Sequence, residues 1–198
     1  MLSDASVLRN FAILGWVDQL VALAGGEVYV AHGVMGLYDD DPGEIEAIRA
    51  AFVEESLNNP GSPTSTAATV AVVGLDALLG RRSRDITVVS PTDDEFAVAL
   101  RLQDPGERTW RQGLGVRSRR LDAGEAVSIA IATARGLAFA SDDDDARVAY
   151  LALEGSRHVW TLDLIQEAVH RGLLDERAAR AGYEKLRQMY RFWGPPWT

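Results

Sequence analysis

An apolar run that ends in four consecutive aspartates constrains this chain more than any other feature. Leu137-Ala-Phe-Ala140 has the length and the flanks of a buried strand, with Gly136 before it and Asp142 to Asp145 after it. Open α/β sheets bind ligands at the carboxyl ends of their strands, so these aspartates stand where a ligand site is expected. Carboxylates packed together raise one another's pKa unless a cation lies between them, and Mg2+ prefers oxygen ligands. Aspartates also favour a helix N-terminus, but capping alone does not require four.

Two further acids stand in similar positions elsewhere in the chain. Asp4 ends the apolar start Met1-Leu-Ser, and Glu125 falls in the first turn of a helix whose apolar spacing begins near residue 122. If the strands before Asp4 and Asp142 are parallel neighbours, Asp4 and either Asp142 or Asp143 project from one edge of the sheet. Glu125 can reach them from the start of a flanking helix. Three carboxylates that converge from distant parts of the chain predict a metal site.

Three short motifs that contain these acids follow one another along the chain. They are Asp-Ala-Ser-Val-Leu at 4–8, Leu-Asp-Ala-Gly-Glu-Ala at 121–126 and Ser-Asp-Asp-Asp-Asp-Ala-Arg at 141–147. In order and spacing they resemble the acidic motifs of PIN-domain nucleases, in the toxin-like (VapC-type) branch. The tail from Trp160 to Leu174 is also similar to that branch, so the likeness spans nearly the whole chain.

The resemblance implies a metal-dependent ribonuclease that hydrolyses RNA phosphodiester bonds with Mg2+ or Mn2+. The residues it assigns to catalysis and to metal binding are Asp4, Glu125, Asp142 and Asp143. The hydroxyl of Ser6 would help to hold the water shell of the metal, and Ser141 could play a similar part, although either can equally be a turn or cap residue. The implied partners are an RNA substrate, a small antitoxin protein and a second copy of the chain in a homodimer.

The chain departs from the family after its second expected strand. The family has a glutamate there, whereas this chain has Gly36 or Leu37 at the matching position. Asp39, Asp40 or Asp41 could replace that acid, with Glu44 or Glu46 as weaker candidates, because a shift along a helix turns a side chain away. The departure keeps a second hypothesis open: a degenerate, non-catalytic PIN domain that binds a protein or RNA without cutting it.

Length and composition indicate one soluble domain over residues 1–198. At 47% hydrophobic and 25% charged residues, the chain has an ordinary globular composition. No apolar segment reaches membrane-spanning length, and the start lacks the pattern of a signal peptide, so we expect no membrane contact. The absence of cysteine excludes disulfides and thiolate metal ligands. A cytoplasmic location follows as an expectation.

The net charge of −9 argues against a protein that coats nucleic acid, because phosphate binding depends on lysine and arginine. The charge is unevenly distributed. Arg117, Arg119 and Arg120 lie in a stretch without acids, where they could hold an RNA backbone beside the acidic pocket. A solvated loop or a contact with an acidic partner explains the same cluster equally well.

The order of expected elements predicts an α/β fold: a three-layer α/β/α sandwich of PIN type with a mainly parallel sheet of about five strands. Residues 58–84 look like a helical insertion. Ser90 is expected to cap a helix, and Arg147 to pair with Glu125 or contact phosphate. The expected strands are 1–3, 27–31, 86–89, 137–140 and 157–161; the expected helices are 6–23, 43–57, 64–80, 91–103, 122–135, 144–154, 162–171 and 175–192.

Overall fold

Five parallel strands form one sheet in the order β3-β2-β1-β4-β5. The computed structural model describes residues 1–36, 42–58, 60–82, 84–116, 121–190, 192 and 194–197, and the structural statements below concern these residues. The expected α/β class and five-stranded sheet are confirmed, and each expected strand contains one of those found. The strands are β1 (Leu2–Ser3), β2 (Val28–Ala31), β3 (Ile86–Val89), β4 (Phe139–Ala140) and β5 (His158–Val159).

Helices occupy most of the remaining described chain. They are α1 (Ala5–Leu14), α2 (Val17–Leu23), α3 (His32–Met35), α4 (Glu44–Asn58), α5 (Pro63–Leu79), α6 (Asp93–Gln103), the 3-10 helix η1 (Pro105–Glu107), α7 (Arg108–Gly113), α8 (Ala123–Ala134), α9 (Asp144–Ala152), α10 (Thr161–His170) and α11 (Glu176–Met189).

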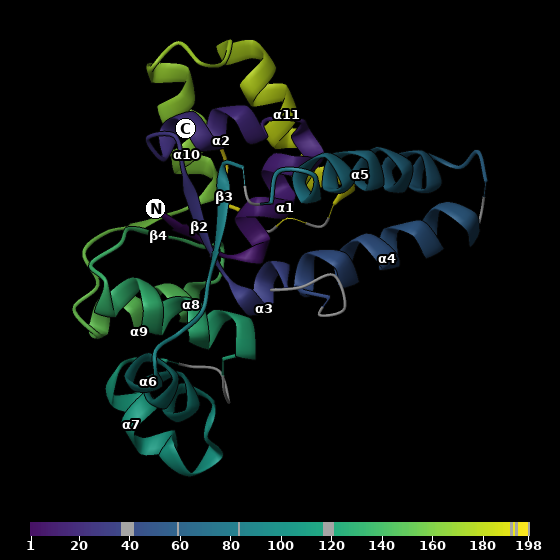
Figure 1. Ribbon diagram of the computed structural model, residues 1–198. Helices are drawn as coiled ribbons and strands as arrows, with labels where there is room; N and C mark the ends of the chain where they lie inside the picture. The colour runs from purple at the N-terminus through teal and green to yellow at the C-terminus, as the bar shows by residue number, and fades with distance from the viewer. Residues whose placement is uncertain are drawn as a thin grey trace.

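The sheet lies between two groups of helices. Helix α8 packs against β1, β2 and β4, while α1 packs against α2, α5 and α10. Figure 1 shows α8 and α9 on one side of the sheet and α1, α2 and α5 on the other. Both residues of β1 and both residues of β4 are buried, as in a parallel sheet that is covered on two faces. This packing explains why these strands read as apolar runs and not as alternating patterns.

Several helix boundaries differ from the expected ones. The single helix expected over 6–23 is two, because Gly15 adopts the left-handed conformation (φ 72°) that ends α1. The cap expected at Ser90 is wrong: Thr92 caps α6 and forms a reciprocal capping box with Glu95. Short α3 and α7 were not expected, because so few residues show no helical periodicity. Helix α10 ends two residues before Gly172, whose positive φ of 70° favours glycine.

The segment 58–84 contains α5, which packs against α4 and α1 on the path from β2 to β3. Figure 1 shows α4 and α5 running side by side away from the sheet. The side chains of Ala71, Leu75 and Leu78 are fully buried, which explains the strongly apolar sequence of this helix. No helix in the described ranges combines the length and the apolar character needed to cross a membrane.

Candidate active site

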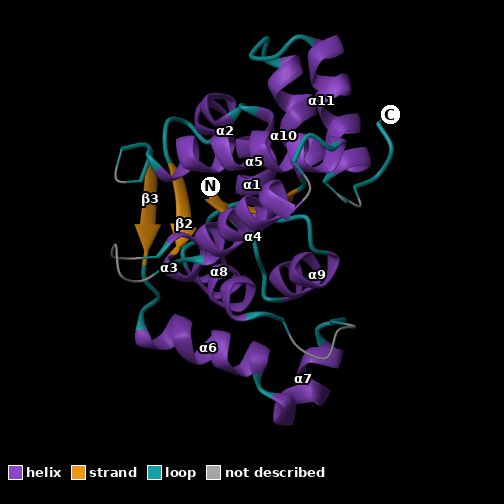
Figure 2. Ribbon diagram, turned by 90° about the vertical axis from the view of Figure 1, so that its right-hand side faces the viewer, coloured by secondary structure: helices purple, strands orange, loops and turns teal. Residues whose placement is uncertain are grey.

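Asp4 and Asp142 follow β1 and β4, the two neighbouring strands between which the strand order reverses. From β1 the chain builds outward to β2 and β3, and then returns to place β4 on the other side of β1. Ser3 pairs with Ala140, so the residues that follow β1 and β4 leave the same edge side by side. In Figure 2 the arrows of β2 and β3 both point toward α3, which marks this carboxyl edge. Open α/β sheets bind their ligands at such a switch point.

Asp4 is the most buried acid of this edge, with 3% of its surface exposed. The hydroxyls of Ser6 and Ser141 donate to its Oδ2 over 3.2 and 3.3 Å, so both serines contact this acid directly. Its Oδ1 is buried and has no hydrogen-bond partner of normal geometry in the described residues. A buried carboxylate oxygen without a donor is costly, so this atom calls for a ligand.

Four carboxyl groups around the site have raised pKa values: those of Asp4, Glu44, Glu125 and Asp142. Burial raises the pKa of Asp4 to about 6, and the charge of Asp122 adds to the shift. Burial also raises the pKa of Glu125 to about 8, with further contributions from Asp122, Asp143 and Asp4. Each group therefore disfavours its own ionised form and that of its neighbours. A cation at this point would relieve both effects.

The Asp142 side chain accepts hydrogen bonds at both of its carboxylate oxygens. Its Oδ1 accepts from the backbone N–H of Thr161 at 2.8 Å, and its Oδ2 accepts from the Thr161 hydroxyl at 2.5 Å and from Asn10 Nδ2 at 2.9 Å. These bonds join the end of β4 to the first turn of α10 and to α1. The side chain is consumed by this network, so Asp142 holds the site together more than it offers oxygen to a ligand.

Asp143 and Glu125 each spend one oxygen on a helix start. Asp143 Oδ1 caps α9 by accepting from Ala146 N at 2.7 Å, and Glu125 Oε2 accepts from Asp122 N in the capping box of α8. Within the described chain, their other oxygens have no hydrogen-bond donor. Both side chains line one open pocket of about 250 Å³ together with Asp4, Ser6, Arg9, Asp142 and Phe192.

Glu44, which the sequence analysis treated as a weaker candidate for an acid of the site, lies beside the other acids. It opens α4, and its Oε2 lies so close to Gly124 that a Cβ there would be 3.1 Å away. Burial raises the pKa of Glu44 to about 7, and the charges of Asp4 and Asp122 raise it further. No distance along the sequence reveals this approach, because it depends on the close packing of Gly43 against Gly36. Asp39, Asp40 and Asp41 lie outside the described residues.

Gly36, one of the two positions where the resemblance would place a glutamate, has a local reason to be glycine. This residue has φ 71° and ψ 156°, a conformation that strains any side chain with a Cβ. Gly43 packs directly against it: a Cβ on Gly43 would lie 2.3 Å from Gly36 N. This tight contact brings the start of α4 back to the site, so Glu44 arrives from a later point in the chain. Leu37 lies outside the described residues.

The chemistry of these side chains fits a hard divalent cation, although their arrangement is open. All the donors are carboxylate oxygens, and one of them, Asp4 Oδ1, is buried without a partner. Within the described ranges, however, no three acids converge closely enough to enclose one ion. The capping bonds of Asp143 and Glu125 account for this spread.

The arginines expected near the site have mixed outcomes. Arg117, Arg119 and Arg120 lie outside the described residues. The pairing expected between Arg147 and Glu125 is wrong: Arg147 Nη2 pairs with Asp144 Oδ1 at 3.0 Å, three residues earlier on α9.

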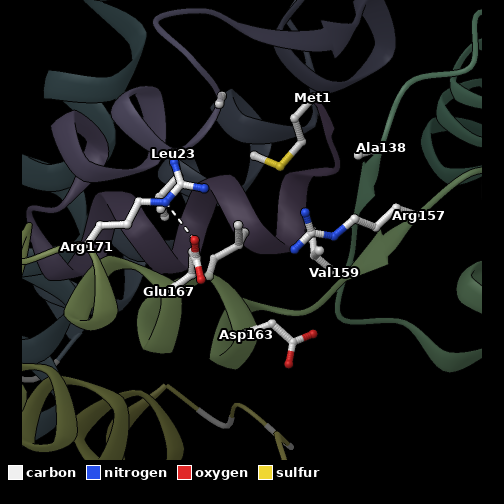
Figure 3. Close-up of a pocket in the computed structure, with 10 residues that line it drawn as sticks. Met1, Leu23, Ala138, Arg157, Val159, Asp163, Glu167 and Arg171 are labelled. Carbon is white, nitrogen blue, oxygen red and sulfur yellow. Dashed lines mark hydrogen bonds and ion pairs between the residues drawn. The ribbon is translucent and has the colours of Figure 1, made fainter.

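A second pocket lies at the opposite edge of the sheet. It is lined by Met1, Ala138 and Arg157, which precede β1, β4 and β5, and by residues of α2 and α10 (Figure 3). Glu167 and Arg171 face each other across its wall and form an ion pair of 2.6 Å. The amino ends of parallel strands carry no switch point, so the carboxyl edge remains the candidate active site.

Comparisons with known proteins add no family to this chain. A scan against models of protein families finds no match, and searches of curated proteins and of solved structures find none either.

Proposed function

We propose that this protein is a metal-dependent endoribonuclease whose active site is the acidic pocket at the carboxyl ends of β1 and β4. The observation that carries the proposal is Asp4: its buried Oδ1 has no hydrogen bond of normal geometry within the described residues, and its side chain lines a pocket together with further acids. The motif resemblance supports the same reaction. Compared with the residues that the resemblance assigns, the proposed metal ligands include Glu44. Asp142 is proposed to hold the neighbouring backbone in place and not to bind the metal.

The residues that would hold Mg2+ or Mn2+ are Asp4, Glu44, Glu125 and Asp143. Bound there, the cation would lower the pKa of a water molecule and polarise the phosphodiester. Ser6 and Ser141 fix the orientation of Asp4 through Oδ2, which leaves Oδ1 for the ligand. Asp142 fixes the neighbouring backbone through Thr161 and Asn10. None of these side chains needs to act as a nucleophile.

Manganese is expected to stabilise the folded protein and to activate cleavage. A ligand that binds only the folded state raises the free energy of unfolding by about 2.7 kcal/mol at a hundred times its Kd. The measurement is a melting curve across a Mn2+ titration, beside cleavage of a pool of single-stranded RNA, with DNA of the same sequences in parallel. A melting temperature that ignores millimolar Mn2+, together with uncut RNA, would contradict the proposal.

Glu44→Gln is expected to weaken the response to Mn2+ by about tenfold in affinity, since one anionic ligand is lost. The matched control is Glu46→Gln, which removes the same charge from the same helix but points to a different face. The Mn2+ titration of the melting temperature measures both variants. Equal responses from the two variants would remove Glu44 from the site.

The alternative, a non-catalytic binding module, is favoured by the open arrangement of the acids. It predicts RNA or protein binding with no cleavage under any divalent cation. The nuclease proposal also includes a cytoplasmic location, a small antitoxin protein as partner, and a homodimer. The resemblance supports the two partners, and the cysteine-free composition supports the location.

A further inference from the structure

Arg9 is a positive charge set among the acids of the pocket without an ion pair to any of them. It lies on α1, five residues after Asp4, and its half-buried side chain lines the pocket. The charges of Asp142, Glu44 and Asp4 all act on its guanidinium group. Among the described acids, none lies within ion-pair distance of Arg9, whereas Arg147 on α9 pairs with Asp144.

The guanidinium group is held in place by a neutral side chain. Arg9 Nε and Nη2 donate to Asn10 Oδ1 over 3.3 and 3.2 Å. Asn10 is fully buried, and its own Nδ2 donates to Asp142 Oδ2 and to Thr161 Oγ1. The orientation of Arg9 is therefore fixed by the same network that joins β4 to α10. Two of its five N–H donors are used, which leaves three for a ligand.

This arrangement suits an anionic ligand better than a structural counter-charge. A counter-charge gains most by direct pairing with a carboxylate, and an arginine with several acids around it has that opportunity. Arg9 instead donates to the neutral Asn10 side chain, and its remaining N–H groups are available at the pocket. An RNA backbone that approaches these acids meets repulsion, so a fixed cation is needed where the phosphate must lie.

We propose that Arg9 is a catalytic residue that binds a non-bridging oxygen of the phosphodiester to be cleaved, and this inference rests on the proposed nuclease function. The planar guanidinium group donates two parallel hydrogen bonds that match the geometry of a phosphate. The ionised carboxylates around it have no N–H or O–H to donate and repel the phosphate. As charge accumulates on the phosphate oxygens during hydrolysis, the N–H donors of Arg9 stabilise it. Asn10 is then a positioning residue.

The test compares Arg9→Gln and Arg9→Lys with the wild type. Arg9→Gln should reduce the rate of single-turnover RNA cleavage in Mn2+ by roughly 100- to 1,000-fold, the usual effect of losing one such donor. Arg9→Lys should recover only part of the rate, because it keeps the charge but not the fork. The affinity for Mn2+, followed by melting temperature, should rise in Arg9→Gln because a competing cation is gone. Arg49→Gln is the control: Arg49 pairs with Asp76 on the α4–α5 hairpin.

A second measurement separates this inference from the nuclease proposal. The anisotropy of a labelled single-stranded RNA in Ca2+ reports binding without a need for cleavage, and Arg9→Gln should weaken it by about tenfold relative to Arg49→Gln. If the wild type binds RNA through Arg9 but never cuts it, the nuclease proposal fails and the phosphate contact stands. If Arg9→Gln binds and cuts RNA as Arg49→Gln does, Arg9 is a counter-charge only. A parallel loss of Mn2+ affinity and folding stability would assign it a structural role.

Discussion

Asp4→Asn is expected to abolish metal-dependent cleavage while making the metal-free protein more stable. Asparagine keeps the shape of the side chain but removes the buried charge. Raising the pKa of Asp4 from its ordinary 3.8 to about 6 makes the ionised form cost about 3 kcal/mol at pH 8. The variant recovers only part of this, because its amide N–H groups also need partners. Each kcal/mol recovered raises the melting temperature by about 2–4 °C.

The same charges determine how the stability of the metal-free wild type depends on pH. Asp4, Glu44 and Glu125 have pKa values of about 6, 7 and 8 in the folded protein, all above their ordinary values of 3.8, 4.5 and 4.5. Between these limits the folded state binds more protons than the unfolded state, so the free energy of unfolding falls as the pH rises. Melting temperatures from about pH 5 to pH 8 should therefore decrease in EDTA. Mn2+ should flatten or reverse the trend.

Two observations would count against this account of Asp4. One is a metal-free protein that gains stability between about pH 5 and pH 8, because its acids would then have lowered pKa values in the folded state. The other is an Asp4→Asn variant that still responds to Mn2+ like the wild type. The pH slope of Asp4→Asn itself should be shallower, since one of the three groups no longer titrates.

Asp142 and Asp143 are neighbours in sequence, yet their substitutions should have opposite consequences. Asp142→Ala leaves the N–H and hydroxyl of Thr161 and the amide of Asn10 without their acceptor, in a buried setting. Unsatisfied buried donors cost about 1–3 kcal/mol each. The substitution also removes the cost of burying the Asp142 charge, which offsets part of this loss of stability. We expect a loss of about 3 kcal/mol in the free energy of unfolding, measured by denaturant titration.

Asp143→Asn is the matched comparison. Asparagine caps helices as well as aspartate does, so α9 should keep its start and the free energy of unfolding should change by less than about 0.5 kcal/mol. The cleavage of RNA should nevertheless disappear, and the affinity for Mn2+ should fall by at least about tenfold, as expected for Glu44→Gln, because an anionic ligand is gone. If Asp142→Ala were as stable as the wild type, or if Asp143→Asn still cleaved RNA, the division of roles between the two aspartates would be wrong.

The sequence by itself determined the five strands and the edge of the sheet where acids gather. The apolar runs before Asp4 and before Asp142 predicted strands, because parallel strands covered on two faces are apolar throughout. The spacing around Glu125 predicted its place in a first helical turn, where a capping box holds it. These signals can be read from the sequence because each depends on only a few neighbouring residues.

Only the tertiary structure decided what each acid of that edge contacts. Asp142 and Asp143 are chemically identical and adjacent, but the first meets Thr161 and Asn10, and the second meets only its own helix. Glu44 enters because Gly36 and Gly43 pack tightly and return the chain to the site. The role proposed for Arg9 depends on the charges of Asp142, Glu44 and Asp4, which reach it from three different parts of the chain. Such contacts join residues far apart in the chain, and no periodicity or spacing records them, because they depend on how the packed layers meet.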